Sequence, residues 1–273
     1  MRCSAKVYLT LAAMVRDQEH YIREWLTFHE MIGVERFVIV LHKCSDSTES
    51  EIRRLPFFNT KIRLHHVVND EQRAQMGAFR WMLDCYGSST EWMLFIDSDE
   101  FFFGTVENDL RLILSRYECF SGIAAHWLMF GASGHVIRPP MPSIEYFTRR
   151  IQDARFVHRG IKSAVKPREV VDVLSPHLFV TKHGTVRENR EIVDPNGIWQ
   201  CRDKEPVWNV LRCNHYNTRS MEDWVARRKR GSCNDFRLAS NYDIDHFYRY
   251  NSETVEDLTI QRFVPELKSR LLQ

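Results

Sequence analysis

Apolar and polar positions alternate between two kinds of segment in the first hundred residues. Apolar runs of strand length are separated by stretches in which apolar residues recur at helical spacing. The predicted strands are 7–15, 36–41, 61–68 and 92–96. The predicted helices are 21–32, which Gly33 ends, a segment capped by Ser45 or Ser47 that runs to Leu55, and 72–85. This alternation predicts an α/β fold with a mostly parallel sheet.

The pattern becomes irregular beyond residue 104, where glycines and prolines interrupt short apolar runs. We expect loops to dominate there and to serve recognition of a substrate over a rigid scaffold. A helix is predicted from Ser220, with Asp223 as the acid of a capping box. Residues 252–272 are predicted to form a surface helix interrupted at Pro265. One domain is expected, with a Rossmann-like half (1–104) and an irregular half (105–273).

The apolar run at 92–96 leads directly into Asp97-Ser98-Asp99-Glu100. Ligand sites of open α/β sheets lie beyond the carboxyl ends of their strands, where these acids fall. Two carboxylates held close together repel each other unless one is protonated or a cation lies between them. Hard oxygen ligands suit Mg²⁺ or Mn²⁺, which also binds substrate phosphates, so the segment predicts a phosphorylated ligand. The alternative is a solvated turn.

Composition excludes several classes of function. The net charge is +2, from 38 basic and 36 acidic residues, so binding of nucleic acid is not favoured. The seven cysteines are scattered without a C-x-x-C pair, which favours neither a zinc site nor a disulfide framework. No apolar run approaches the ~20 residues of a membrane span, and 7–15 lacks the cleavage site of a signal peptide. We therefore expect a cytoplasmic protein without a transmembrane segment, and peripheral membrane association stays open.

Four segments together resemble the GT-A glycosyltransferases of family 92 and the related family-2-like group. They are 14–26 with Gly33-Val34, the acidic segment 91–101, 130–135 with Glu145, and 214–220 before Arg230-Gly231. The resemblance implies a GT-A fold and transfer of a sugar from a nucleotide-diphosphate sugar, with Asp97-x-Asp99 binding the metal and the diphosphate. The sequence departs from the family pattern after the second predicted strand, where relatives usually have an Asp-Asn pair and only Asp46 matches.

A metal site follows from this resemblance. Asp99 is expected to be the first ligand of Mn²⁺ or Mg²⁺, and Asp97 to bind the metal directly or through water while also contacting the donor. His215 is the candidate third ligand, with His177 and His183 as rivals; a structural histidine is the alternative. Glu100 either orients a ligand or merely begins the next turn.

Other candidates concern donor binding and proton transfer. Glu145 is the candidate base that would deprotonate the acceptor hydroxyl in an inverting reaction, and pairing with Arg149 or Arg150 is the alternative. Asp17, Glu19 and Asp46 are donor-binding candidates, although acids at helix starts more often serve as caps. Lys162 and Arg230 are candidates for neutralising phosphate charge. The alternative is that their side chains are simply exposed to solvent, as most lysines and arginines are.

Two other functions stay open. An Asp-x-Asp segment after a strand also occurs in metal-dependent phosphatases and phosphotransferases, and the divergent 40–46 loop leaves room for a non-catalytic nucleotide-sugar-binding module. The resemblance favours UDP as the donor nucleotide. A glycan or lipid-linked glycan, such as one used in polysaccharide biosynthesis, is the expected acceptor.

Overall fold

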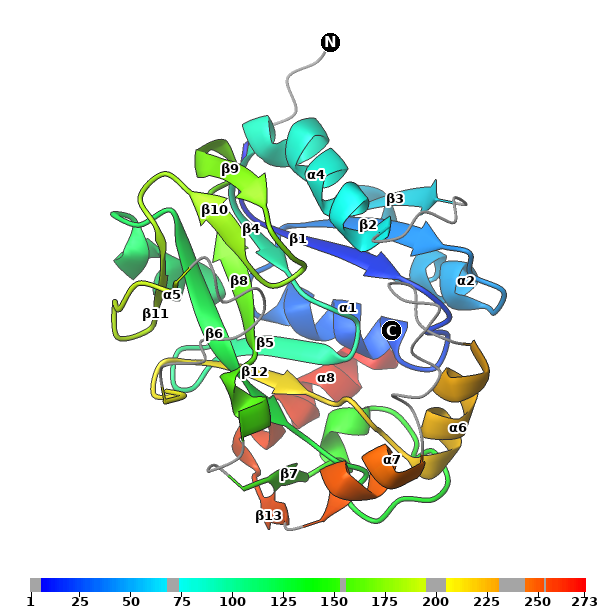
Figure 1. The fold of residues 1–273 in the computed structure, drawn as a ribbon. Coiled ribbons are helices and arrows are strands. Elements are labelled where there is room, and N and C mark those ends of the chain that lie inside the picture. The colour runs from blue at the N-terminus through cyan, green and yellow to red at the C-terminus, as the bar shows by residue number, and fades with distance from the viewer. Residues whose placement is uncertain (1–5, 68–73, 153–155, 195–204, 231–243, 253) are drawn as a thin grey trace.

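A computed structural model describes residues 6–67, 74–152, 156–194, 205–230, 244–252 and 254–273. Its centre is a nine-stranded sheet in the order β3-β2-β1-β4-β8-β6-β12-β5, with β11 beside β6 (Figure 1). These strands are β1 (Val7–Val15), β2 (Arg36–His42), β3 (Ile62–Val67), β4 (Thr90–Phe95), β5 (Glu100–Gly104), β6 (Gly122–Met129), β8 (Ile161–Val165), β11 (Thr185–Arg187) and β12 (Leu211–His215). Two small sheets pair β7 (Arg149–Ile151) with β13 (Thr254–Glu256), and β9 (Val170–Val173) with β10 (Phe179–Thr181).

Eight α-helices surround the sheet in the described part of the chain. They are α1 (Ile22–Met31), α2 (Thr48–Arg53), α3 (Phe58–Lys61), α4 (Ala74–Tyr86), α5 (Leu110–Leu114), α6 (Met221–Arg230), α7 (Ile244–Asn251) and α8 (Val264–Leu271). Short 3₁₀ turns are η1 (Gly87–Ser89), η2 (Ser115–Tyr117), η3 (Ser143–Glu145), η4 (Phe156–Arg159), η5 (Pro167–Glu169) and η8 (Thr259–Phe263).

The predicted fold class is confirmed. β3, β2, β1 and β4 are parallel neighbours, and β6 is parallel to β11 and β12, so the sheet is mostly parallel. β8 runs antiparallel to β4 and β6, and β5 runs antiparallel to β12. The first three strands lie within a residue or two of the predicted ranges, and this α/β architecture agrees with the GT-A fold that the resemblance implied.

Alternating side chains of the central strands enter two separate cores. Leu9 and Leu11 of β1 pack in the core that α1 and α8 cover, whereas Ala12 and Met14 face the core that α4 covers. Figure 1 shows α4 on one side of the sheet and α1 with α8 on the other. Such double coverage explains why these strands read as continuous apolar runs rather than as alternating patterns.

The irregular half differs from the expectation of loops. Residues 105–273 supply β6, β8, β11 and β12 to the same sheet as the first half. Several of these strands are short and carry buried polar residues, among them Lys162 and His215, so they lack the apolar run that would reveal a strand. The two halves of the chain therefore share one sheet.

Two helix predictions from the last third have different outcomes. The capping box of α6 is confirmed, since Ser220 Oγ donates to Asp223 Oδ2 at 2.6 Å and accepts from the Asp223 N–H at 3.2 Å. The surface helix predicted over 252–272 forms only as α8, and its predicted interruption at Pro265 is wrong. The first part of this range contains β13, and Pro265 lies in the first turn of α8, where its missing N–H costs no hydrogen bond.

Within the ranges that the structure covers, none of the helices combines the length and the apolar character that crossing a bilayer requires.

Candidate active site

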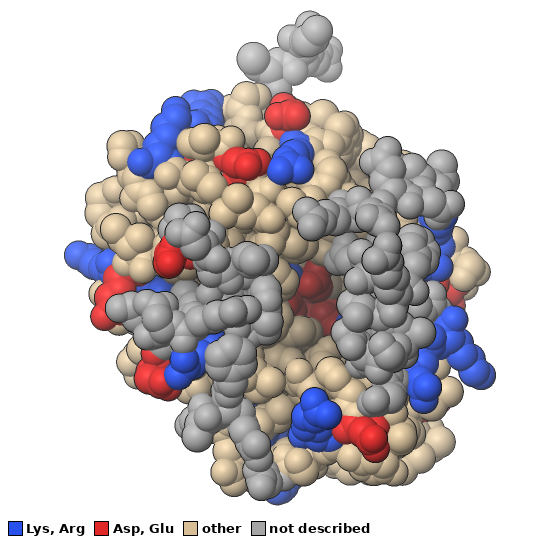
Figure 2. Space-filling view, in the orientation of Figure 1, with Lys and Arg blue, Asp and Glu red and all other residues tan. Residues whose placement is uncertain are grey.

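A pocket of about 500 Å³ opens at the carboxyl ends of β1 and β4 and beside the end of β12. Figure 2 shows a hollow near the centre of this face, with acidic side chains inside it. The predicted residues among its lining are Asp17, Glu19, Asp46, Asp97, Asp99 and His215. The structure thus brings together most of the candidates, from segments that lie up to two hundred residues apart in sequence.

Asp97 lies at the base of this pocket between two side-chain donors. Its Oδ1 accepts from Gln75 Nε2 at 2.6 Å, and its Oδ2 accepts from Lys162 Nζ at 2.6 Å. Burial alone would raise the pKa of Asp97, but the attraction of Lys162 outweighs burial and the pKa is lowered. Asp97 is therefore an anion at neutral pH.

Asp99 faces two residues of the last third of the chain. Arg227 Nη1 donates to its Oδ2 at 3.1 Å, and His215 Nε2 lies 3.6 Å from its Oδ1. Burial would raise the pKa of Asp99, yet His215 and Arg227 hold that pKa well below its usual range. The Tyr216 N–H donates to the Asp99 carbonyl at 2.8 Å, which joins the acidic loop to the end of β12.

The residues present fit a divalent cation. Carboxylate oxygens and an imidazole nitrogen suit Mn²⁺ or Mg²⁺. Within the described part of the chain, two buried polar atoms beside Asp97 and Asp99 have no hydrogen-bond partner, Glu100 Oε1 and His215 Nδ1. A positive charge is what this acidic loop attracts, as its contacts with Lys162 and Arg227 already show.

Asp17, Glu19 and Asp46 bind two loops to each other at the edge of the pocket. The Ser45 N–H donates to Asp17 Oδ1 at 2.7 Å, and the Glu19 N–H donates to Asp46 Oδ2 at 3.0 Å. The Ser47 N–H in turn donates to Glu19 Oε2 at 3.0 Å. Asp46 Oδ1 also accepts from the N–H of Thr48, the first residue of α2, at 2.9 Å. These acids therefore shape the pocket edge.

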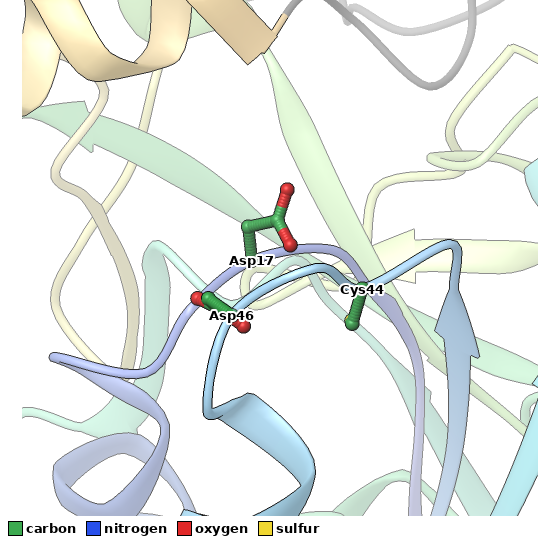
Figure 3. Close-up of side chains that lie close together, drawn as sticks. All are labelled: Asp17, Cys44 and Asp46. Atoms are coloured by element: carbon green, nitrogen blue, oxygen red, sulfur yellow. The ribbon is translucent and has the colours of Figure 1, made fainter.

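Cys44 joins two of these acids in a compact group. Candidate ligand atoms of Asp17, Cys44 and Asp46 all lie within 4.8 Å of one another, and Figure 3 shows the three side chains on two neighbouring loops. The hydrogen bonds between the loops account for this proximity.

Lys162 and Arg230 have different positions. Lys162 of β8 is fully buried below the pocket, 2.6 Å from Asp97 Oδ2 and 3.3 Å from Glu100 Oε2, so its positive charge neutralises the acidic loop. Burial would lower the pKa of Lys162, but Asp97 and Glu100 raise it. Arg230 is the last residue of α6, and its side chain lies outside the described part of the structure.

Glu145 lies in η3, outside the described lining of the pocket. Its carboxylate forms an ion pair with Lys268 of α8 at 2.6 Å. The pairing with Arg149 or Arg150 is not its contact in the structure, because Arg149 bonds to Thr254 and Arg150 to Asp257.

The two rival histidines differ in place. His177 lines the pocket, and its Nδ1 lies 3.1 Å from the Ile161 carbonyl. Burial and the nearby charge of Lys162 lower the pKa of His177 to about 3, so it is a neutral imidazole. His183 lies outside the described pocket lining.

Three further pocket residues were missed by the sequence analysis. Gln75 of α4 contacts Asp97, and Arg227 of α6 contacts Asp99. Arg219 donates to the Ser98 carbonyl at 2.9 Å and to Gln18 Oε1 at 2.8 Å, and its guanidinium lies 3.7 Å from the centre of the Tyr21 ring. Arg219 lies within the 214–220 segment that carries the family resemblance, so the sequence did indicate this region. For Gln75 and Arg227 we find no such signal.

Comparisons with known proteins agree on one family. Residues 6–232 match the family model described as glycosyltransferase family 92. A family 92 protein of Ricinus communis is 32% identical over 234 residues, covering 82% of this chain and 40% of the relative. One of Oryza sativa subsp. japonica is 27% identical over 212 residues, covering 75% and 34%. The chain thus spans less than half the length of these relatives.

Solved glycosyltransferases are among the structures that resemble this chain. Mannosyltransferase PcManGT of Pyrobaculum calidifontis, in complex with GDP-Man and Mn²⁺, is 13% identical with a TM-score of 0.41, covering 97% of this chain and 69% of that one. Glucosyl-3-phosphoglycerate synthase of Mycobacterium tuberculosis, with Mn²⁺, UDP-glucose and phosphoglyceric acid, is 13% identical with a TM-score of 0.34, covering 60% and 57%.

Proposed function

This chain belongs to glycosyltransferase family 92, and we propose that it transfers a sugar from a nucleotide-diphosphate sugar to a hydroxyl group of an acceptor in a metal-dependent reaction. The observation that carries the proposal is the pocket that Asp97, Asp99 and His215 line together at the end of the parallel strands. Nucleotide-binding α/β sheets bind their ligands at this edge.

In the proposed reaction, the bond between the anomeric carbon and the diphosphate breaks, and negative charge develops on the leaving nucleoside diphosphate. Asp97, Asp99 and His215 would hold Mn²⁺ or Mg²⁺, which stabilises that charge when bound. Arg219 and Arg227 supply positive charge at the same pocket wall. Lys162 keeps Asp97 ionised, so that its carboxylate stays available as a ligand.

The donor site is proposed to extend along the loops after β1 and β2. Asp17, Glu19 and Asp46 line that end of the pocket, and their main hydrogen bonds already fix the loops. Their role in the proposal is to hold a preformed wall against which the nucleoside packs. UDP is the proposed nucleotide on the family resemblance alone, and a glycan or lipid-linked glycan is the proposed acceptor.

Trp127 is a candidate platform for the sugar. It lines the pocket and packs against His215, with ring centres 4.6 Å apart. Phe130, three residues further along the chain, is fully buried in the core. Apolar ring faces suit the C–H groups of a sugar, and Trp127 presents such a face at the pocket.

The base that accepts the acceptor's proton is not assigned by this geometry. Glu145 stays a hypothesis for that role, and two observations count against it: Lys268 neutralises it, and it lies outside the described pocket lining.

The test is release of nucleoside diphosphate from a panel of nucleotide sugars, with Mn²⁺ or with EDTA, for the wild type and Asp99→Asn. The variant removes a ligand charge and changes little volume. We expect the wild type to release nucleoside diphosphate with Mn²⁺ and not with EDTA. In Asp99→Asn we expect a loss of at least about 100-fold, exceeding the 10–100-fold that is typical of groups that only orient a ligand.

The matched control is Asp172→Asn, which removes an acidic group at the surface, where Asp172 contacts Arg80. This variant should keep wild-type turnover. Metal-independent release, or full activity of Asp99→Asn, would contradict the proposed site. Release of inorganic phosphate in place of nucleoside diphosphate would favour the phosphatase alternative.

A further inference from the structure

Glu100 is the third carboxylate of the acidic segment, and it lies opposite His215. We propose that Glu100 is a positioning residue, which accepts a hydrogen bond from His215 Nδ1–H and so presents His215 Nε2 to the metal. This inference rests on the proposed function, because it specifies how that function's third ligand is oriented. Metal-ligating histidines usually donate their second ring N–H to such a partner.

Strand register places the two residues together. β5 and β12 are antiparallel, and Glu100 is the direct cross-strand partner of His215. Directly opposed residues have neighbouring Cβ atoms on the same face of a sheet. The pairing is fixed by the backbone ladder and does not depend on a flexible loop.

Among the described residues, Glu100 is hydrogen-bonded through one carboxylate oxygen and not through the other. The fully buried carboxylate accepts from the Asp97 N–H through Oε2 at 2.9 Å, and Lys162 Nζ lies 3.3 Å from that same oxygen. Its Oε1 is buried and has no hydrogen-bond partner in the part of the chain that the structure describes, although buried polar atoms nearly always have one.

His215 presents the complementary arrangement. Its Nδ1 is likewise buried, has no hydrogen-bond partner within the described ranges and lies 3.8 Å from Glu100 Oε1. Its Nε2 lies 3.6 Å from Asp99 Oδ1 on the wall of the pocket. A neutral imidazole that donates from Nδ1 keeps the lone pair on Nε2, which is the atom on the metal's side.

A competing interpretation is that Glu100 serves only as a buried counter-ion for Lys162. Both interpretations use Oε2, but only the positioning role uses Oε1. Glu100→Gln separates them. The amide oxygen must take the place of Oε2, because Asp97 N–H and Lys162 are both donors. The amide NH₂ then faces His215 Nδ1, which must act as the acceptor. This favours the tautomer of His215 that carries its proton on Nε2, and a protonated Nε2 has no lone pair with which to bind a metal.

The experiment measures Mn²⁺ binding by calorimetry or electron paramagnetic resonance in the presence of UDP. We expect the dissociation constant for Mn²⁺ to rise about 10–100-fold in Glu100→Gln. The control is Glu24→Gln, in which another fully buried carboxylate, bonded to the N–H groups of Ser143 and Ile144, is changed away from the pocket. Its Mn²⁺ affinity should equal that of the wild type.

A second measurement does not depend on the folding of Glu100→Gln. In ¹⁵N-histidine-labelled wild-type protein, two-bond ¹H–¹⁵N spectra should assign the proton of neutral His215 to Nδ1, with the signals identified from their loss in His215→Gln. A proton on Nε2 would overturn the inference, as would unchanged Mn²⁺ affinity in folded Glu100→Gln. Absence of Mn²⁺ binding in the wild type would instead overturn the proposed function, and the tautomer would still report on Glu100.

Discussion

The acidic segment contains three carboxylates with three different environments. Asp97 contacts Gln75 and Lys162, Asp99 contacts Arg227, and Glu100 is buried behind them. Burial raises the pKa of Glu100 to about 7 against the opposing effect of Lys162, whereas the pKa values of Asp97 and Asp99 are lowered by their neighbours. The two acids of the Asp-x-Asp pair are therefore the anions that a metal would meet.

Sequence reasoning recovered these residues because they directly follow a strong apolar strand. It could not recover the partners of Asp97 and Asp99. Gln75 and Arg227 lie in helices whose local sequence contains no sign of the acids they contact, 22 and 128 residues away. Long-range contacts of this kind depend on how helices pack, which is not encoded in spacing.

Glu145→Gln tests the base that the family resemblance suggested. Because Glu145 pairs with Lys268 outside the described pocket lining, we expect the variant to keep its turnover and to lose less than about 1 kcal/mol of stability. Initial rates and thermal melts measure both. Lys268→Met breaks the same ion pair and should show the same turnover and the same small loss of stability as Glu145→Gln. A fall in turnover of about 10²–10⁴-fold in Glu145→Gln alone would instead identify the base.

At the scale of elements, His29 connects α1 to β5. This fully buried histidine has its Nδ1 2.8 Å from the Trp25 carbonyl, and its Nε2 accepts from the Phe102 N–H at 3.3 Å. The neutral ring thus satisfies both contacts, donating through Nδ1. Trp25 Nε1 also donates to the Glu100 carbonyl at 2.7 Å, so α1 supports the strand that begins at the acidic segment.

His29 makes the stability of the fold dependent on pH. Burial lowers the pKa of His29 from 6.5 to about 3, so the folded state excludes a proton that the unfolded chain binds. Its contribution is present above pH 6.5 and is lost as the pH falls toward 3. Between pH 7 and pH 5 this loss amounts to about 2 kcal/mol in the free energy of unfolding.

Urea denaturation at both pH values measures that loss. His29→Gln keeps one donor and one acceptor but does not titrate. Between pH 7 and pH 5, its free energy of unfolding should therefore fall by about 2 kcal/mol less than that of the wild type. His66→Gln, which changes an exposed histidine, is the control and should match the wild type. Equal pH dependence in all three proteins would refute the role of His29.

Elements were predictable where burial on both faces leaves a continuous apolar run, as in β1 and β2. They were not predictable where a strand carries the chemistry. β12 has the sequence Leu-Arg-Cys-Asn-His, and β8 includes Lys162. These polar residues interrupt the apolar run that would identify each strand in the sequence. Pro265 was misread because a proline in a helix start and one in a helix interior look the same without a known boundary.

At the scale of the whole molecule, one sheet assembles the site from distant parts of the chain. β4 precedes the acidic loop, β8 supplies Lys162 and β12 supplies His215, and these strands come from both halves of the sequence. Because the pairing of β5 with β12 and of β4 with β8 crosses the residue 104 boundary, we expect the described chain to unfold as one cooperative unit.

The central claim is that the pocket binds a nucleoside diphosphate together with a divalent cation. Calorimetric titration of UDP into the wild-type chain, with Mn²⁺ and again with EDTA, tests it most directly. We predict saturable binding with Mn²⁺ and a loss of most of the affinity with EDTA, because Asp97 and Asp99 repel a diphosphate without the cation between them. Equal binding of UDP in both solutions, or none in either, would contradict the account.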